Sequence, residues 1–360
     1  MKMLTTTSTM PAGWANEGRA LALVGAQYGS EGKGAVAGIL ASQQPGMLWI
    51  RTGGPNAGHT VVHNDTHERE VFCSVPCGAV DETATLVIGA GAMIDADGLQ
   101  EEMRRRPGRR VYVDGAASVI HHLLHDEGGV RGDLHQRIGS TGKGVGMARI
   151  ARIKRDENEN LLARHFPWSN KDVEVIDTVR LIHQWLQDGG AAVLEGTQGS
   201  GLSLTHGPWP YVTSADTNAA QLAADAGIPP SMVDAVLVAR TMPIRVAGNS
   251  GPLVGETSWE QISRQLGQPV TETTTVTRKT RRVGAWDEAL FARAVMLNAP
   301  IWCALTFLDY WDGGGARGVN RWSDLPTQAR LRVLEIERRH GVDFRLLLTG
   351  PEASDAVVRP

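Results

Sequence analysis

The glycine-rich stretch from Gly25 to Gly34 constrains this chain more than any other feature. It reads Gly-Ala-Gln-Tyr-Gly-Ser-Glu-Gly-Lys-Gly, follows the apolar Leu21–Val24 and leads into the apolar Ala35–Leu40. Glycines let a backbone turn its N–H groups toward an anion, and Lys33 adds a compact positive charge. A strand, such a turn and a helix start together predict a P-loop-like phosphate site. A tight turn without a ligand is the other interpretation.

Short apolar runs alternate with helical stretches, which predicts an α/β fold with a mostly parallel central sheet covered by helices. We expect strands at residues 21–24, 47–50, 85–88, 110–113, 191–194, 235–238 and 301–305. No internal repeat is present, so residues 20–360 are predicted to form a single domain with excursions, and the polar residues 156–172 a connection or dimer arm. Residues 1–19 are polar and rich in threonine, and we expect a disordered leader there.

Composition excludes several classes of protein. The net charge of −3 and the pI near 6.4 do not predict a nucleic-acid surface. No apolar run has the length of a membrane span or a signal peptide. Cys73, Cys77 and Cys303 are too few and too poorly spaced for a zinc site or a disulfide framework, which fits a cytoplasmic protein. The arginines at 104–106, 109 and 110 are interpreted as a solvated helix end and turn.

Three further motifs place polar side chains on loops. Arg51–Thr60 reads Arg-Thr-Gly-Gly-Pro-Asn-Ala-Gly-His-Thr, Gly139–Gly146 reads Gly-Ser-Thr-Gly-Lys-Gly-Val-Gly, and Leu194–Thr213 contains Glu-Gly-Thr-Gln-Gly and His-Gly-Pro-Trp-Pro-Tyr-Val-Thr. With the first stretch, and in this order, they resemble the motifs of the adenylosuccinate synthetase family from about Leu21 to Pro351. That family joins a purine 6-oxo nucleotide to L-aspartate. A nucleoside triphosphate phosphorylates O6, and the aspartate amine then displaces the phosphate.

The resemblance implies roles for the first two loops. Lys33 would steady the transferred phosphoryl group, and His59 matches the general acid of the family, a task that suits a side chain with a pKa near 6.5. A structural loop histidine is the alternative for His59. The residues that would surround the donor phosphates are Gly29, Glu31, Gly32, Lys33, Gly34, Gly58 and Thr60.

Ser30 departs from the family pattern, which has an aspartate at this position. That aspartate removes the N1 proton of the base and binds magnesium, and a hydroxyl does neither well. Either the enzyme is dead or its substrate has changed, and we favour a changed substrate because the other motifs are retained. Guanine adds a 2-amino group beside N1, and a serine oxygen can accept a hydrogen bond from it. The pattern resembles the bacteriophage branch of the family, which makes 2-amino-2′-deoxy-N6-succinyladenylate from dGMP, aspartate and ATP for diaminopurine DNA.

Three functions therefore remain open at this stage. The chain is a ligase for dGMP and aspartate that uses ATP or dATP, an ordinary synthetase that uses IMP and GTP, or a non-catalytic nucleotide-binding protein. If the chain is encoded by a phage, its place is the host cytoplasm.

The loop Thr275–Gly284 aligns on the aspartate loop of the family. Thr277, Lys279 and Arg281 would bind the aspartate substrate, and a solvated basic turn is the alternative. Lys279 replaces an arginine that in the family also touches the ribose, and a lysine lacks the bidentate fork.

The donor base is expected near Phe307 and Asp309, with Thr349 and Gly350 close by. Phe307 replaces a family lysine that flanks guanine, so ATP or dATP is the expected donor, since an aromatic ring stacks on any purine. A merely packed Phe307 is the alternative.

The remaining assignments follow from alignment alone. Gln198 would contact the oxo group, and Arg155 would reach the partner's phosphate across a homodimer, although Arg152 could fill that role. Mg²⁺ would be bound by Ser30 and the carbonyl of Gly58. The nucleotide substrate would be held by Ser30, Asn56, Gly139, Ser140, Thr141, Arg155, Gln198, Thr213, Val246 and Lys279.

Overall fold

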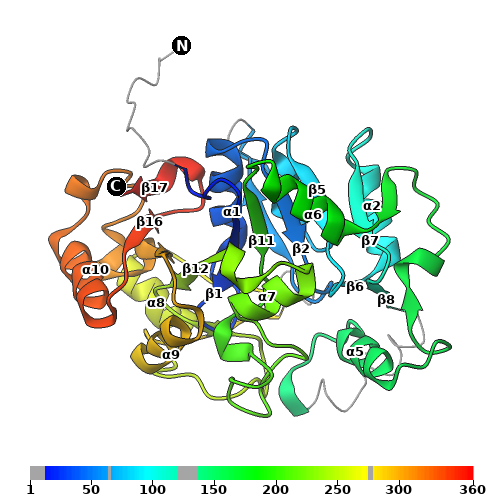
Figure 1. Ribbon diagram of the computed structural model, residues 1–360. Coiled ribbons are helices and arrows are strands. Elements are labelled where there is room, and N and C mark those ends of the chain that lie inside the picture. Colours follow the sequence, from blue (N-terminus) through cyan, green and yellow to red (C-terminus); the bar gives the residue numbers. More distant parts are fainter. Residues whose placement is uncertain (1–12, 64–65, 121–136, 275–278, 360) are drawn as a thin grey trace.

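A ten-stranded sheet runs through the middle of the molecule (Figure 1). The computed structural model describes residues 13–63, 66–120, 137–274 and 279–359. The strand order is β10-β7-β5-β2-β11-β1-β12-β15-β16-β17, and every pair of neighbours is parallel except β16 with β17. The predicted α/β class with a mostly parallel sheet is confirmed. The strands are β1 (Ala20–Gly25), β2 (Leu48–Arg51), β5 (Thr85–Ile88), β7 (Val111–Asp114), β10 (Val173–Ile176), β11 (Ala192–Glu195), β12 (Val233–Arg240), β15 (Trp302–Thr306), β16 (Phe344–Leu348) and β17 (Ala356–Val358).

Helices cover both faces of this sheet, which explains why its central strands are apolar except near their ends. In β1, Leu21 and Leu23 pack toward one core, whereas Ala22 and Val24 pack toward the other. The first core includes α1 (Lys33–Gln43) and α2 (Ala96–Arg104). The second includes α6 (Thr178–Gln187), α7 (Ala219–Ala226), α9 (Glu288–Asn298) and α10 (Thr327–His340).

Smaller elements surround the carboxyl edge of the sheet. They comprise the pairs β3 (His59–Val62) with β4 (Arg69–Phe72) and β13 (Ile244–Arg245) with β14 (Arg282–Val283), and a three-stranded sheet of β6 (Met93–Ile94), β8 (Ser118–Val119) and β9 (Leu161–Leu162). Two further helices, α5 (Val145–Lys154) and α8 (Trp259–Leu266), pack on small cores of their own. Residues 156–172 contain β9, so this stretch is a connection that returns to the domain.

All seven predicted strands are present, each shifted by at most two residues. Sequence reasoning missed β10, β16 and β17. β10 reads Val-Glu-Val-Ile in a polar neighbourhood, and β17 is a three-residue edge strand, so neither stands out as an apolar run. The described part of the chain has no helix that is long and apolar enough to cross a membrane.

The predicted disordered leader is wrong for residues 13–19, while residues 1–12 lie outside the described part. Trp14 is buried, and its indole lies 5.0 Å from that of Trp302 in β15. Its Nε1 donates to Gln43 Oε1 at 2.9 Å. Arg19 forms an ion pair with Asp234 at 2.7 Å. Because the segment is polar in composition, sequence reasoning overlooked Trp14, whose buried side chain anchors it.

Three of the five arginines near the end of α2 are exposed as predicted, whereas Arg106 and Arg109 are half-buried. Arg106 pairs with Glu70 and lies over the ring of Phe72 at 4.5 Å. Arg109 Nη2 donates to the carbonyls of Asp81 and Ala84 at 3.0 and 3.1 Å. Arginine stems pack on apolar surface while their head groups find oxygen partners.

The sheet positions the sequence motifs because its parallel strands end at one edge. The glycine-rich loop leaves β1, the loop of Asn56 leaves β2, the loop of Gln198 leaves β11 and Phe307 follows β15. Open α/β sheets bind their ligands outside the carboxyl ends of the strands. A candidate site is therefore expected there.

We predict that Trp14→Ala lowers the free energy of unfolding by about 3 kcal/mol, because a large buried ring is removed from the core. Chemical denaturation measures the change. Trp209→Ala is the matched control, since Trp209 is 75% exposed, and a loss within about 0.5 kcal/mol is expected for it. Equal losses in the two variants would contradict the anchoring role of Trp14.

Candidate active site

The phosphate loop is folded around the carboxylate of Glu31. Oε1 of this buried residue accepts hydrogen bonds from the N–H groups of Gln27 at 3.0 Å and Gly29 at 2.8 Å. Oε2 lies 2.7 Å from Nζ of Lys33. Two amides and a lysine thus surround an anion, which is the arrangement of a phosphate-binding nest. Here the protein supplies that anion itself, and Glu31 fixes the loop and Lys33.

The loops after β1 and β11 are joined by Lys33 and Gln198. Nζ of Lys33 donates to the carbonyl of Gln198 at 2.5 Å. A Cβ on Gly29 would lie 3.4 Å from Oε1 of Gln198, so the two loops are in contact. Gly34 is required on the other side, because a Cβ there would collide with the backbone of Thr60 in β3. The structure therefore brings together Gly29, Glu31, Lys33, Gly34, Thr60 and Gln198, as predicted from the motifs.

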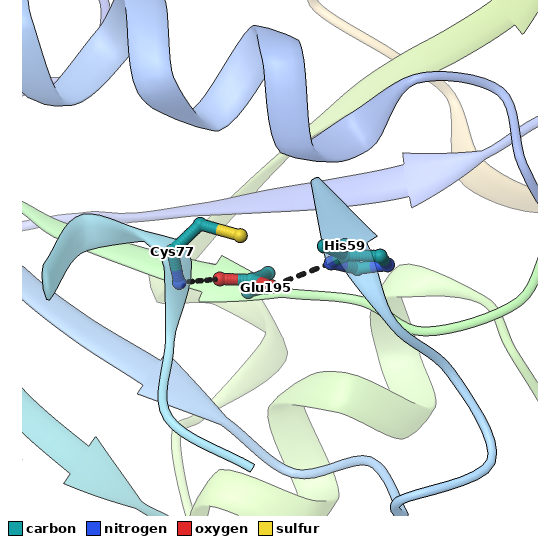
Figure 2. A group of neighbouring side chains, drawn as sticks. All are labelled: His59, Cys77 and Glu195. Carbon is teal, nitrogen blue, oxygen red and sulfur yellow. Dashed lines mark hydrogen bonds and ion pairs between the residues drawn. The ribbon is translucent and has the colours of Figure 1, made fainter. Parts of the chain in front are cut away.

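His59 and Glu195 form a buried pair (Figure 2). Nδ1 of His59 lies 2.5 Å from Oε1 of Glu195. The same oxygen accepts from Nη1 of Arg51 at 2.7 Å, and Oε2 accepts from the N–H of Cys77 at 2.6 Å. A carboxylate behind a histidine fixes the ring and its tautomer. Nδ1–H therefore faces Glu195, and Nε2 remains for chemistry.

The charges of this pair follow from burial and from its neighbours. Burial lowers the pKa of His59, even though the hydrogen bond to Glu195 acts in the opposite direction. For Glu195, burial would raise the pKa, but the Arg51 guanidinium and the hydrogen bonds from His59 and Cys77 outweigh it and hold the pKa at about 2. At neutral pH, Glu195 is an anion and His59 is a neutral imidazole whose Nε2 can accept a proton.

His59, Cys77 and Glu195 also lie close enough together to hold a metal ion, with their ligand atoms within 4.8 Å of one another (Figure 2). The local charges do not favour this. Glu195 is already neutralised by Arg51. Burial raises the pKa of the Cys77 thiol well above its usual range, and a thiol must lose its proton to bind a metal. We therefore interpret the cluster as a histidine with its orienting carboxylate.

Ser30 lies at the tip of the phosphate loop with a left-handed backbone, φ 59°. Its Oγ accepts a hydrogen bond from the guanidinium of Arg281, which comes from the predicted aspartate loop. Its carbonyl accepts from Nη1 of Arg240 at 3.1 Å, and Arg240 is paired with Glu272 at 2.6 Å. Ser30 therefore joins the phosphate loop to the aspartate loop.

The predicted magnesium ligands fit the structure poorly. The Oγ of Ser30 faces the guanidinium of Arg281, which repels a second cation. The nearby carboxylate of Glu31 is occupied by two amides and Lys33. Mg²⁺ requires available oxygen ligands, preferably carboxylates. We therefore assign no reaction step to a metal, and the carbonyl of Gly58 stays a prediction.

The residues predicted to contact the base of the donor nucleotide also make contacts within the protein. The ring of Phe307 lies 3.9 Å from the guanidinium carbon of Arg240 and is half-buried. Burial raises the pKa of Asp309, although Arg317 lies 3.2 Å away and opposes this. The hydroxyl of Thr349 is buried and donates to backbone carbonyls. A Cβ on Gly350 would collide with Asp355. Thr349 and Gly350 shape the turn, and a contact of Phe307 or Asp309 with a donor base stays a prediction.

Three of the residues predicted to hold the nucleotide substrate line one cavity. Asn56, Gln198 and Thr213 line it, whereas Thr141 does not. A Cβ on Gly139 would lie 3.3 Å from Val246, so the loops of Gly139 and Ser140 and of Val246 are neighbours. Lys279 is exposed beside Thr274, and its N–H donates to Thr274 Oγ1 at 3.1 Å. Gly32 keeps its place in the phosphate loop with φ 85°. Thr277 lies outside the described residues.

The two arginines predicted for the dimer contact differ. Arg155 is exposed at the end of α5. Arg152 is bound within its own chain, because its Nη1 donates to the carbonyl of Ala116 and to Ser118 Oγ at 2.9 Å. Arg155 is thus the better candidate for a contact with a second copy.

Sequence reasoning missed Arg51, Glu195, Arg240 and Glu272. Arg51 and Glu195 lie inside the motifs at the last positions of β2 and β11, so their place at strand ends was a usable signal. Arg240 and Glu272 are paired only by the tertiary fold.

Comparisons with known proteins agree with this geometry. The sequence profile of adenylosuccinate synthetase matches residues 22–161 and 157–315. Adenylosuccinate synthetases of Methanococcus maripaludis and Pyrococcus horikoshii are each 35% identical to this chain, covering 93% and 94% of it and 97% of each relative.

Two solved structures are similar. Succinoaminodeoxyadenylate synthetase (PurZ) of cyanophage S-2L, bound to dGMP and to dATP as an energy donor, matches with a TM-score of 0.81 and 29% identity over 95% of each chain. Fully ligated adenylosuccinate synthetase from Plasmodium falciparum has a TM-score of 0.82 at 19% identity, over 94% of this chain and 99% of that chain, and shows the same fold.

We predict that Glu195→Gln destabilises the protein by about 3–5 kcal/mol near pH 7, because it leaves the buried Arg51 without its counter-charge. Since Glu195 has its pKa lowered from 4.5 to about 2, its stabilising effect is complete above pH 4.5 and is lost as the pH falls toward 2. The difference between wild type and variant should therefore shrink on acidification, which denaturation at several pH values measures. The exposed Glu101→Gln is the control, and a pH-independent difference would contradict this account.

Proposed function

The chain belongs to the adenylosuccinate synthetase family and is a ligase that forms a carbon–nitrogen bond, and we propose that it joins L-aspartate to the 6-position of dGMP with hydrolysis of ATP or dATP. The products would be 2-amino-2′-deoxy-N6-succinyladenylate, the nucleoside diphosphate and phosphate. The reaction runs through a 6-phosphoryl intermediate.

The observation that carries the choice of dGMP is the hydroxyl at Ser30. It stands at the tip of the phosphate loop and accepts a hydrogen bond from Arg281. A serine oxygen can accept from the 2-amino group of guanine, which IMP lacks. The similarity to the cyanophage enzyme, whose structure contains dGMP and dATP, supports the same choice.

In this proposal, His59 takes over the proton transfers that Ser30 cannot perform. The neutral imidazole accepts the N1 proton of the guanine base, directly or through one water, and O6 then attacks the γ-phosphorus while the diphosphate leaves. Glu195 stabilises the resulting imidazolium. When the aspartate amine attacks C6, the C6–O6 bond breaks, His59 returns its proton to the departing phosphate, and the proton lost by the amine nitrogen passes to water. His59 thus takes one proton and returns one in each cycle.

The remaining residues bind and position the substrates. Lys33 balances charge on the transferred phosphoryl group, Arg281 faces the aspartate carboxylates, and Phe307 stacks on the adenine of the donor. Arg155 extends toward a second copy of the chain in a homodimer. Mg²⁺ remains a prediction of the family resemblance.

An ordinary synthetase acting on IMP is the second candidate, because the curated relatives bear that name at 35% identity. It would require Ser30 to replace a carboxylate without loss of rate.

We predict phosphate release with dGMP, aspartate and ATP, and a kcat/KM for IMP lower by at least about 100-fold, since a site built for a polar group rejects an analogue that lacks it. A phosphate-release assay with each nucleotide measures both values. Turnover with IMP alone would establish the ordinary reaction, and binding without turnover for either would indicate a non-catalytic protein.

Ser30→Asp tests the residue directly. We expect it to lose activity with dGMP, because the longer carboxylate crowds the 2-amino group, and to gain activity with IMP. Ser30→Ala is the matched control: it removes the hydroxyl, so it should lower selectivity for dGMP without creating IMP activity. Unchanged selectivity in both variants would remove Ser30 as the discriminating residue.

We predict that kcat/KM for dGMP decreases as the pH falls below 6.5. The pKa of His59 is lowered from 6.5, and only the neutral imidazole accepts a proton. Rates between about pH 5 and pH 8 measure this. His63→Gln, which changes a histidine paired with Glu70 on the surface hairpin, should leave the profile unchanged. A rate that rises on acidification would show that His59 must be protonated beforehand.

A further inference from the structure

The cavity behind Gln198 has the composition of an oxyanion site. It lies between the loops after β2 and β11 and the helices α5 and α7. Its wall offers the amide of Asn56, the hydroxyls of Thr52, Thr197 and Thr213, and the backbone of two glycines, Gly53 and Gly54. Hydroxyls, amides and glycine backbone are the groups that surround phosphate oxygens.

Arg149 carries the only positive charge among the described residues that line this cavity. It lies on α5, one turn after Val145, and both side chains face the cavity. Arg149 lies outside the motifs identified in the sequence.

The guanidinium of Arg149 lacks a full set of partners. Its Nε is buried and has no hydrogen-bond partner among the described residues. Burial lowers the pKa of Arg149, and the nearby carboxylate of Asp225 offsets this only in part. A buried, poorly paired cation is costly unless an anion binds to it.

The two carboxylates of the cavity do not take the place of that anion. Asp216 is occupied, since it accepts from Ser203 Oγ at 2.5 Å and from Thr205 at 2.8 and 2.9 Å. Asp225 accepts from Gln221 Nε2 at 2.8 Å. Burial raises its pKa and the charge of Arg149 opposes this rise, but no ion pair or hydrogen bond joins the two side chains among the described residues.

The position of Gln198 indicates which anion enters. Gln198 meets Lys33 on one side and lines the cavity on the other. A nucleotide whose purine lies at Gln198 presents its 6-oxygen to the phosphate loop and extends its sugar and 5′-phosphate into the cavity. The aspartate substrate is expected at Arg281, on the Ser30 side of Gln198.

We infer that Arg149 binds the 5′-phosphate of the nucleotide substrate within its own protomer, opposite Asn56 and Thr213. This rests on the proposed function only in that the substrate is a purine nucleoside monophosphate. Arg149 of the same chain then balances the charge of the phosphate. The exposed Arg155 adds a contact to a second copy of the chain and is not the sole cation at the phosphate.

The test is the dependence of binding on the 5′-phosphate. Calorimetric titrations of wild type and Arg149→Gln with dGMP and with deoxyguanosine should show dGMP weakened about 10- to 100-fold, the range for hydrogen bonds to a charged group, and deoxyguanosine changed by no more than about twofold. Arg105→Gln, at an exposed arginine that pairs with Glu101, is the control and should change neither. The same titrations with IMP and inosine give the result for the phosphate even if dGMP is not the substrate.

Other outcomes would overturn the inference. Equal weakening of dGMP and deoxyguanosine would make Arg149 a structural residue. Unchanged dGMP binding in Arg149→Gln together with a loss in Arg155→Gln would assign the phosphate to the second copy. A raised KM for aspartate with unchanged dGMP binding would assign Arg149 to the other substrate.

Asp225→Asn provides an independent variant if Arg149→Gln does not fold. It keeps the shape and the contact with Gln221 but removes the competing charge. We expect dGMP to bind severalfold more tightly and deoxyguanosine to be unaffected. Weaker binding of dGMP by this variant would contradict the proposed geometry.

Discussion

The active site depends on one buried carboxylate. Glu195 ends the strand β11 and receives hydrogen bonds from Arg51, His59 and Cys77, which belong to three other segments. Each of these donors would be costly to bury alone, and together they hold Glu195 ionised. The same charge fixes the tautomer of His59, so the interaction that joins the segments also prepares the proton acceptor of the proposed mechanism. Stability and chemistry are thus coupled at a single residue.

A second buried pair connects the sites for the two other substrates. Arg240 is bound to Glu272 near the aspartate loop, donates to the carbonyl of Ser30 and lies under the ring of Phe307. A purine stacked on Phe307 and a dicarboxylate near Arg281 would therefore both act on groups that contact Arg240. In the proposed function, Arg240 would thus connect the donor, the phosphate loop and the aspartate loop, which suits a reaction that depends on positioning.

Much of the fold and of the site was predictable from sequence, for a physical reason. Central parallel strands are buried on both faces and read as apolar runs, and the loops at their carboxyl ends need glycines wherever backbones approach closely, as at Gly34 beside Thr60. The edge strand β17 and the alternating β10 carry no such run. Arg240 and Glu272 come from segments that are distant in sequence, and so do the residues around Arg149. No local sequence pattern therefore predicts these contacts. Trp14 was overlooked because a polar composition was taken as disorder.

The replacement of an acid by Ser30 has an electrostatic consequence for its neighbours. The phosphate loop already contains the carboxylate of Glu31, which occupies the amides of Gln27 and Gly29. A second carboxylate at position 30 would add a negative charge beside Arg281 and Glu31. The neutral hydroxyl leaves the charge of Arg281 to the substrate. The loss of a base at Ser30 is then tolerable only if another group accepts the proton, and the neutral His59 backed by Glu195 is the group at this site that meets the requirement.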